Sequence, residues 1–237
     1  MPRPSLAVLG MLMTMIVGCA DPGGNDRVAE RAPAADPAPV AGEEDPADRP
    51  MILFVGTSLT AGYGILQDQA YPALIEERLE REGFPHEVEN AGVSGETSAG
   101  ALRRVDWLLR RPFDVLVLET GANDMLRGAD PDATRDNIQQ IIDRVRADRP
   151  GVPIVLLGMR AAPNLGREYV ERFDRIYQEL AEENDLALVP FLLEEVGGER
   201  EMNLPDGVHP NPAGHGRMAE TVWPVLREVL RDPPTGG

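Results

Sequence analysis

From Met51 onward the chain alternates short apolar runs with longer segments whose apolar residues recur at helical spacing, and this alternation constrains the fold most strongly. The run Val-Leu-Val-Leu within 114–119 is the clearest strand candidate, because an unbroken apolar run is typical of a parallel strand buried on both faces. In all, five strands are predicted, at 51–55, 86–90, 114–119, 153–157 and 186–189. The pattern therefore predicts an α/β domain in three layers (an α/β/α sandwich) around a five-stranded parallel sheet.

The segments between these runs are predicted to be helices. Two of them begin at Asp130-Pro131 and Asn211-Pro212, because proline is favoured in the first turn of a helix. The others are expected over 72–81, 98–110 and 167–183. Thr97 or Ser98 is expected to cap the helix that starts at 98, since a hydroxyl there can accept a hydrogen bond from a free backbone N–H.

The first residues are typical of an export signal. The apolar stretch Leu6–Val17 is too short to span a hydrocarbon core of ~30 Å as a helix, and it fits the apolar region of a signal peptide over 1–18. It ends at Cys19, the only cysteine in the chain, in a context that resembles a bacterial lipobox. We expect an exported protein that is anchored to the membranes of a bacterial cell envelope by a lipid on Cys19. The alternative is an ordinary signal peptide with an incidental cysteine.

Residues 20–50 differ sharply in composition from the remainder of the chain. They contain six prolines and eight acidic residues, and no large apolar residue besides Val28 and Val40. Such a segment cannot bury enough apolar surface to fold alone. The predicted organisation is a signal peptide at 1–18, a disordered tether at 19–50, a folded domain at 51–231 and a flexible tail at 232–237.

The charged residues exclude several classes of protein. The 40 acidic residues outnumber the 23 basic ones, all of which are arginine, and the net charge is −17. Without lysine the chain cannot be a P-loop NTPase or a pyridoxal enzyme, and its acidity argues against nucleic-acid binding. Three histidines and one cysteine are too few for a four-ligand zinc site.

Four polar clusters follow predicted strands, at 56–60, 90–96, 121–124 and 206–211. In an open parallel sheet these positions meet at one edge, beyond the carboxyl ends of the strands. Together the clusters supply a hydroxyl, small residues with accessible backbone N–H groups, an amide, and a carboxylate with an imidazole. Each cluster alone would be read as a turn or a helix cap, but the set has the parts of an acyl-transfer site.

In this order the four clusters resemble the four sequence blocks of the SGNH (GDSL-type) hydrolase family. The segments 59–64 and 71–74 are similar to its small bacterial branch of arylesterases and thioesterase/lysophospholipases. The resemblance implies a flavodoxin-like sheet with strand order 2-1-3-4-5, and a serine hydrolase without cofactor or metal. We expect a monomer.

The resemblance also implies the roles of individual residues. Ser58 would be the nucleophile, His209 its general base, and Asp206 the acid that holds the imidazole. The backbone N–H groups of Ser58 and Gly95 and the side-chain amide of Asn123 would bind the oxyanion. We predict hydrolysis of short-to-medium acyl esters of small molecules or lipids through an acyl-Ser58 intermediate.

One residue departs from the family pattern, because Thr57 stands where an aspartate usually precedes the serine. The triad acid is taken from Asp206, so Thr57→Asp is expected to be active. Two alternatives remain open: a carbohydrate O-acetyl esterase, and a non-catalytic module that binds lipid or glycan. An α/β-hydrolase is disfavoured, because Thr60 replaces the last glycine of its Gly-x-Ser-x-Gly motif.

Several other residues are expected to have structural or surface roles. His215 is expected to be structural or exposed, and His86 to lie on the surface. Trp107 and Trp223 are expected to pack against the sheet. Ser94 and Ser98 are taken as loop and cap residues, and the pairs Arg103-Arg104 and Arg110-Arg111 as solvated helix faces.

Overall fold

The computed structural model describes residues 49–232 of the chain. The predictions for the signal peptide, for Cys19 and for nearly all of the tether lie outside the described residues, as does the expected tail after residue 232. In the described part, no helix combines the length and the apolar character that a membrane crossing requires.

The centre of the fold is a five-stranded sheet in which every neighbouring pair is parallel. Its strands are β1 (Met51–Gly56), β2 (Glu87–Gly92), β3 (Val115–Glu119), β4 (Ile154–Leu157) and β5 (Ala187–Val189). Their order across the sheet is β2-β1-β3-β4-β5. The predicted fold class and strand order are therefore confirmed.

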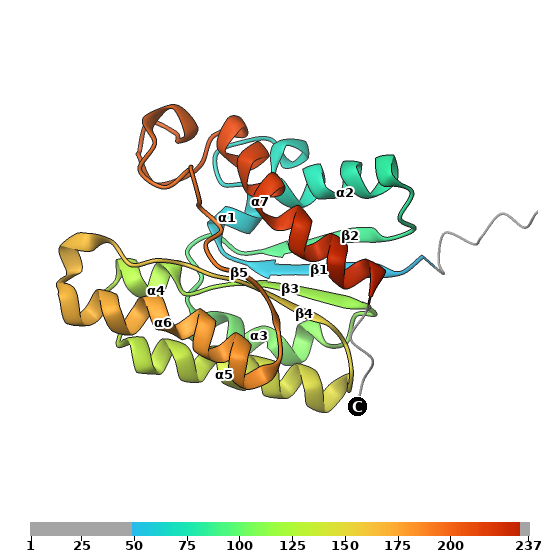
Figure 1. Cartoon of the computed structure of the whole chain (residues 1–237), viewed down its shortest axis with the longest axis horizontal. Coiled ribbons are helices and arrows are strands. Elements are labelled where there is room, and N and C mark those ends of the chain that lie inside the picture. The colour runs from blue at the N-terminus through green and yellow to red at the C-terminus, as the bar shows by residue number, and fades with distance from the viewer. Residues whose placement is uncertain (1–48, 233–237) are drawn as a thin grey trace, which may run out of the picture. The chain divides into compact units, whose positions relative to one another are not determined.

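Helices cover both faces of this sheet, which gives three layers (Figure 1). On one face lie α2 (Tyr71–Glu82) and α7 (Pro212–Arg231), and on the other lie α3 (Ser98–Leu108), α5 (Pro131–Asp148) and α6 (Arg167–Asn184). Two short helices follow strand ends, α1 (Ser58–Ala61) after β1 and α4 (Ala122–Leu126) after β3. Single 3₁₀ turns occupy Gln67–Gln69, Pro163–Leu165 and Arg200–Met202.

Capping side chains set the helix starts that the sequence predicted. Thr97, rather than Ser98, caps α3 by accepting a hydrogen bond from the Gly100 N–H. Asp130 caps α5 and Asn211 caps α7 in the same way, each followed by a proline. These caps satisfy backbone N–H groups that have no partner inside their own helix.

The two tryptophans behave differently from each other. Trp223 is buried, as expected, but Trp107 is 50% exposed, so the prediction that it packs on the sheet is wrong. The apolar stripe of α3 runs through Ala101, Val105 and Leu108, and Trp107 lies off that stripe. Its ring is instead covered by the guanidinium of Arg111, 4.2 Å from the ring centre.

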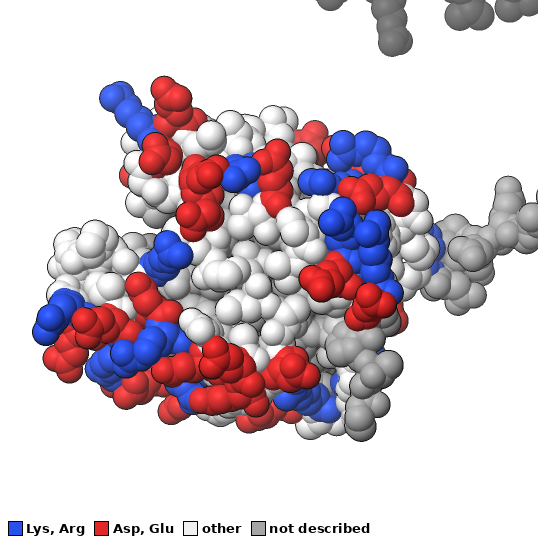
Figure 2. All heavy atoms as spheres, in the orientation of Figure 1, with Lys and Arg blue, Asp and Glu red and all other residues white. Residues whose placement is uncertain are grey.

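The charged residues gather over the helices. Figure 2 shows acidic and basic side chains mixed along the lower margin of the face on view, and an uncharged region at its centre. Among the described pairs, Arg172 of α6 reaches Asp130, the N-cap of α5, and Asp132 in its first turn, each at 2.7 Å. In such pairs an arginine lies between acidic side chains and reduces the repulsion between them.

Candidate active site

The predicted polar clusters meet at one edge of the sheet. Because the strands are parallel and β1 lies between β2 and β3, the loops that follow these three strands are neighbours. Gly56, at the end of β1, pairs with Gly92 at the end of β2. The candidate site therefore lies beyond the carboxyl ends of the strands, where open α/β sheets bind ligands.

Ser58 is the first residue of α1, directly after the end of β1. Thr57 is the N-cap of this helix, and its hydroxyl accepts a hydrogen bond from the Leu59 N–H at 3.4 Å. Gly62 ends the helix in the left-handed conformation, with φ 69°. A strand, a sharp turn and one helical turn thus present Ser58 at the edge of the sheet with 9% of its surface exposed.

Ser58, His209 and Asp206 form one line of hydrogen bonds. The Oγ of Ser58 lies 3.2 Å from Nε2 of His209, and Nδ1 of His209 lies 2.7 Å from Oδ2 of Asp206. The ring of Tyr63 packs against the imidazole, with ring centres 4.5 Å apart. The structure thus brings together the hydroxyl, imidazole and carboxylate that the sequence paired.

The loop that carries Asp206 and His209 is closed on itself. Gly207 has φ 69°, a conformation that favours glycine, and this lets the chain turn between the two side chains. The Leu204 N–H donates to the carbonyl of His209 at 2.7 Å, and Asn203 forms an antiparallel bridge with Pro210. One compact loop therefore fixes the carboxylate and the imidazole relative to each other.

The Asp206 carboxylate is held in its ionised form. The backbone N–H of His209, the His209 ring and the Val208 N–H lower the pKa of Asp206 to about 2. Its Oδ1 accepts from the two backbone N–H groups at 3.0 and 2.9 Å, which leaves Oδ2 for the imidazole. A charged acceptor on Nδ1 keeps the proton there and leaves Nε2 free to accept one from Ser58.

The three groups predicted to bind the oxyanion lie on neighbouring loops at this edge. Gly95 has φ 78°, and its carbonyl accepts a hydrogen bond from Nη2 of Arg127 at 2.9 Å. Asn123 lies in α4, which starts after Gly121 with φ 100°. A Cβ on Gly121 would lie 2.3 Å from the hydroxyl of Tyr177, so glycine lets α4 begin close to the underlying helix α6.

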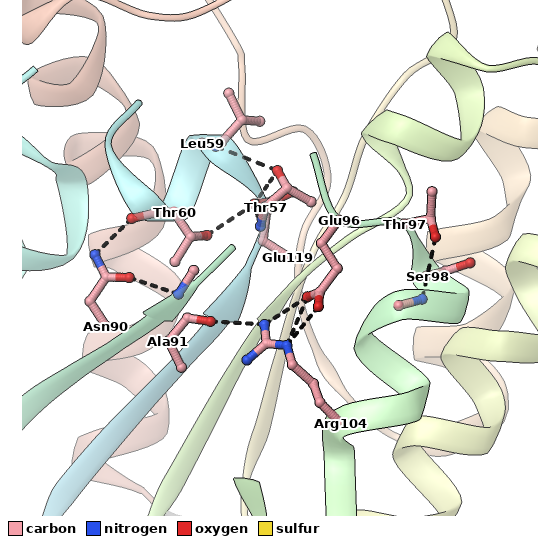
Figure 3. Close-up of polar contacts among 12 residues, drawn as sticks. Thr57, Leu59, Thr60, Asn90, Ala91, Glu96, Thr97, Ser98, Arg104 and Glu119 are labelled. Carbon is pink, nitrogen blue, oxygen red and sulfur yellow. Dashed lines mark hydrogen bonds and ion pairs between the residues drawn. The ribbon is translucent and has the colours of Figure 1, made fainter. Parts of the chain in front are cut away.

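Polar contacts also fix the loop after β2 (Figure 3). The Glu96 carboxylate is paired with Arg104 of α3 at 2.7–3.0 Å, and Arg104 donates to the carbonyl of Ala91 at 2.8 Å. Nδ2 of Asn90, which lies in β2, donates to the carbonyl of Thr60 at 2.7 Å and so ties the end of this strand to α1. Arg104 was expected on a solvated helix face, and that prediction is wrong, because its guanidinium turns inward to bind Glu96.

Residues that the sequence analysis did not single out support the site. Tyr63 contacts His209, Arg127 holds Gly95, and the buried Glu119 carboxylate accepts the Thr57 N–H at 2.7 Å. The only sequence signal for Glu119 is a charge at the end of an otherwise apolar strand.

The other two histidines and Ser98 lie outside the line of three side chains. His215 is buried, and its Nδ1 accepts the Tyr71 N–H at 3.2 Å; burial lowers the pKa of His215 to about 4. His86 is half-buried rather than exposed on the surface, and burial lowers its pKa as well. Ser98 does not cap α3 but is buried and donates to Oδ1 of Asp124 at 2.6 Å.

Within residues 49–232, no group of three or more His, Cys, Asp or Glu side chains is arranged to hold a metal ion.

This fold and this line of three side chains define a serine hydrolase of the α/β/α sandwich type. Residues 54–217 match the GDSL-like Lipase/Acylhydrolase family, and the chain belongs to that family. It is therefore a serine hydrolase that acts on carboxylic ester bonds.

Two known proteins and one solved structure illustrate the relationship. The chain is 42% identical over 180 residues to Esterase TesA of Pseudomonas aeruginosa, an alignment that covers 76% of this chain and 89% of that protein. It is 40% identical over 181 residues to "Thioesterase 1/protease 1/lysophospholipase L1" of Escherichia coli, with 76% and 84% covered. A crystal structure of TesA is similar with a TM-score of 0.72 and 40% identity, and covers 76% of this chain and 99% of that one.

Proposed function

We propose that the chain hydrolyses short-to-medium acyl esters through an acyl-Ser58 intermediate, with His209 as general base and Asp206 as the acid of the triad. The observation that carries this proposal is the line of hydrogen bonds from Ser58 through His209 to Asp206, at 3.2 and 2.7 Å. A serine hydroxyl is a weak nucleophile by itself, and an adjacent imidazole activates it by accepting its proton.

In the proposed acylation step, Nε2 of His209 takes the proton from Oγ of Ser58 as Oγ attacks the ester carbonyl carbon. The carbonyl oxygen becomes an oxyanion, and the N–H groups of Ser58 and Gly95 and the amide of Asn123 donate hydrogen bonds to it. The imidazolium then gives its proton to the leaving alcohol oxygen as the C–O bond breaks. Water, activated by the same imidazole, attacks the acyl-enzyme and releases the acid.

Exposed apolar side chains around the site support an apolar acyl or aryl group in the substrate. The structure describes six exposed large apolar residues, and only Trp107 lies away from this edge. The other five lie in the segments that follow β1, β2 and β3 or in the loop that carries His209: Tyr63, Leu66, Val93, Leu126 and Val208. The names of the relatives, esterase and thioesterase/lysophospholipase, are consistent with an acyl substrate of this kind.

A series of p-nitrophenyl esters with acyl chains of increasing length tests the proposal, with Ser58→Ala as the blank. We expect Ser58-dependent turnover that is highest for short-to-medium chains, and covalent labelling of Ser58 by a fluorophosphonate. An enzyme that turns over acetylated sugars but not these esters would favour the carbohydrate O-acetyl esterase. A wild-type chain with neither turnover nor labelling would favour the non-catalytic module.

We further propose that the protein is exported and anchored by a lipid on Cys19. The support is the apolar stretch that ends at the single cysteine and the acidic, proline-rich segment after it. Labelling cells with a palmitate analogue tests this, with Cys19→Ser as the control. Continued labelling and membrane retention of the Cys19→Ser variant would contradict it.

A further inference from the structure

Glu119 is a buried charge that the catalytic steps above do not use. It is the last residue of β3, after four buried apolar residues, and it is 0% exposed. Within residues 49–232, its hydrogen-bond partners are Thr57 and Thr60, both uncharged. Burial raises the pKa of Glu119, and the hydrogen bonds from Thr57 and Thr60 oppose that shift.

In the part of the chain that the structure describes, the donors to this carboxylate all come from the segment that carries Ser58 (Figure 3). Oε2 accepts the Thr57 N–H at 2.7 Å, and the Thr57 hydroxyl lies 2.9 and 3.0 Å from the two carboxylate oxygens. The Thr60 hydroxyl lies 3.0 Å from Oε2. Glu119 thus binds the residue just before Ser58 and the residue two positions after it.

The turn that presents Ser58 needs such an external support. The helix α1 has four residues, and one helical turn is too short to be stable by itself. The Thr60 hydroxyl also lies 2.9 Å from the hydroxyl of Tyr71, so the same contacts continue into α2. The carboxylate therefore connects the end of β3 to α1, and through α1 to α2.

The end of β1 is shaped to make room for this contact. A Cβ on Gly56 would lie 2.7 Å from Oε2 of Glu119 and 2.0 Å from the hydroxyl oxygen of Thr60. Only glycine fits where the strand passes this carboxylate.

A contribution to the stability of the fold does not explain why a carboxylate occupies this position. A buried carboxylate without a counter-ion is costly, and a well-packed apolar residue in its place is often neutral or stabilising. Its contacts instead lie on both sides of Ser58, at the backbone N–H of Thr57 and at the hydroxyl of Thr60.

We propose that Glu119 is a positioning residue for the nucleophile, which holds α1 so that the hydroxyl of Ser58 meets Nε2 of His209. This inference rests on the proposed function of Ser58. A misplacement of about 1 Å between reacting groups can reduce a rate about 100-fold. Loss of the carboxylate is therefore expected to lower kcat while substrate binding is retained.

The test measures kcat, KM and the rate constant for fluorophosphonate labelling of Ser58 in Glu119→Gln. Gln keeps the shape but replaces one acceptor oxygen with a donor. We expect a fall of about tenfold or more in kcat and in the labelling rate, with KM changed less than about twofold. The matched control is Asn184→Leu, which removes a buried amide and its hydrogen bonds to Gln139 and Leu180 at the opposite edge of the sheet. The control is expected to lose stability but to keep kcat.

A second pair of variants keeps the proposal testable if Glu119→Gln does not fold. Thr57→Val removes the hydroxyl that binds Glu119, whereas Thr57→Ser keeps it, and we expect only the valine variant to lose kcat. The proposal is wrong if folded Glu119→Gln or Thr57→Val keeps kcat within twofold of wild type, or if Asn184→Leu loses as much. A wild-type chain without Ser58-dependent turnover would instead contradict the proposed function, so the two failures are distinct.

Discussion

At the scale of single residues, the structure explains how a threonine can occupy the position before the nucleophile. Thr57 is fully buried, and both its N–H and its hydroxyl bind the Glu119 carboxylate. The hydroxyl also accepts the Leu59 N–H and so caps α1. A threonine can donate and accept at once, and this site uses both abilities.

We expect Thr57→Asp to be active but to differ from wild type in its pH dependence. The new carboxylate would lie beside Glu119, whose pKa burial already raises. Two neighbouring carboxylates favour a shared proton, because both cannot easily be ionised together, and this raises the pKa of the pair further. A pKa raised by folding gives stability at low pH that is lost as pH rises. Urea unfolding at pH 5 and pH 8 checks this. If the unfolding free energy changes equally between pH 5 and pH 8 in the variant and in wild type, the predicted shift in pKa is wrong. An inactive variant would mean that the loop tolerates no second carboxylate.

Asn123→Ala tests the oxyanion site one side chain at a time. Loss of one such donor typically lowers turnover by ~10²–10³. Asn123 is half-buried in α4, so its truncation is expected to change stability little. Steady-state kinetics with a p-nitrophenyl ester and thermal unfolding give the two values. A fall in kcat below about threefold would remove Asn123 from the oxyanion site.

At the scale of elements, the sequence pattern predicted each of the five strands and each of the five long helices that the structure describes. The predicted ends of some elements differ from the observed ends, because contacts with adjacent elements determine where they stop. The strand predicted at 86–90 is β2, Glu87–Gly92, which extends further because Gly92 pairs with Gly56 of β1. The helix predicted to reach Arg110 ends at Leu108. Because its residues lie in local motifs, the resemblance of the four clusters pointed to Ser58, His209 and Asp206, which the structure joins by hydrogen bonds. It also pointed to the oxyanion groups, whose role stays a prediction. It did not find Glu119 or Arg127, because their roles depend on contacts between distant segments.

Gly121→Ala tests how the start of α4 controls Asn123. A Cβ at this position would lie 2.3 Å from the Tyr177 hydroxyl, and φ is 100°, so the backbone must move. We expect a loss of stability of about 1–3 kcal/mol and a lower kcat, because α4 carries Asn123. Gly83→Ala is the matched control, since Gly83 also has positive φ but nothing within 4 Å of its Cβ position. Equal kcat values in the two variants would show that the contact with Tyr177 does not set the oxyanion site.

At the scale of the whole molecule, most acidic residues lie on the surface. Few of the described ionisable side chains are buried. Acidic and basic side chains are mixed over the helices (Figure 2), so many surface charges have an opposite neighbour. Surface pairs contribute little to stability, typically below about 1 kcal/mol each. The pH dependence of folding is therefore expected to depend more on buried groups such as His215.

His215→Gln is expected to make the free energy of unfolding depend less on pH in the acidic range. The pKa of His215 falls from 6.5 to about 4 on burial, so the neutral ring is favoured in the fold. Its contribution is complete above pH 6.5 and is lost as pH falls toward 4, on the order of 2–3 kcal/mol. Gln keeps an acceptor for the Tyr71 N–H but does not titrate. Urea unfolding between pH 7 and pH 4.5 measures the difference, and parallel curves for both proteins would exclude this role.

The hydrogen bond between Ser58 and His209 joins residues 151 positions apart in the chain. A ribosome therefore makes the serine early and the imidazole only when synthesis of the domain is nearly complete. Until His209 has emerged and its loop has closed onto the end of β1, the nascent chain lacks the base proposed for Ser58. The proposed ester hydrolysis is therefore expected to begin only when nearly the whole domain has been made.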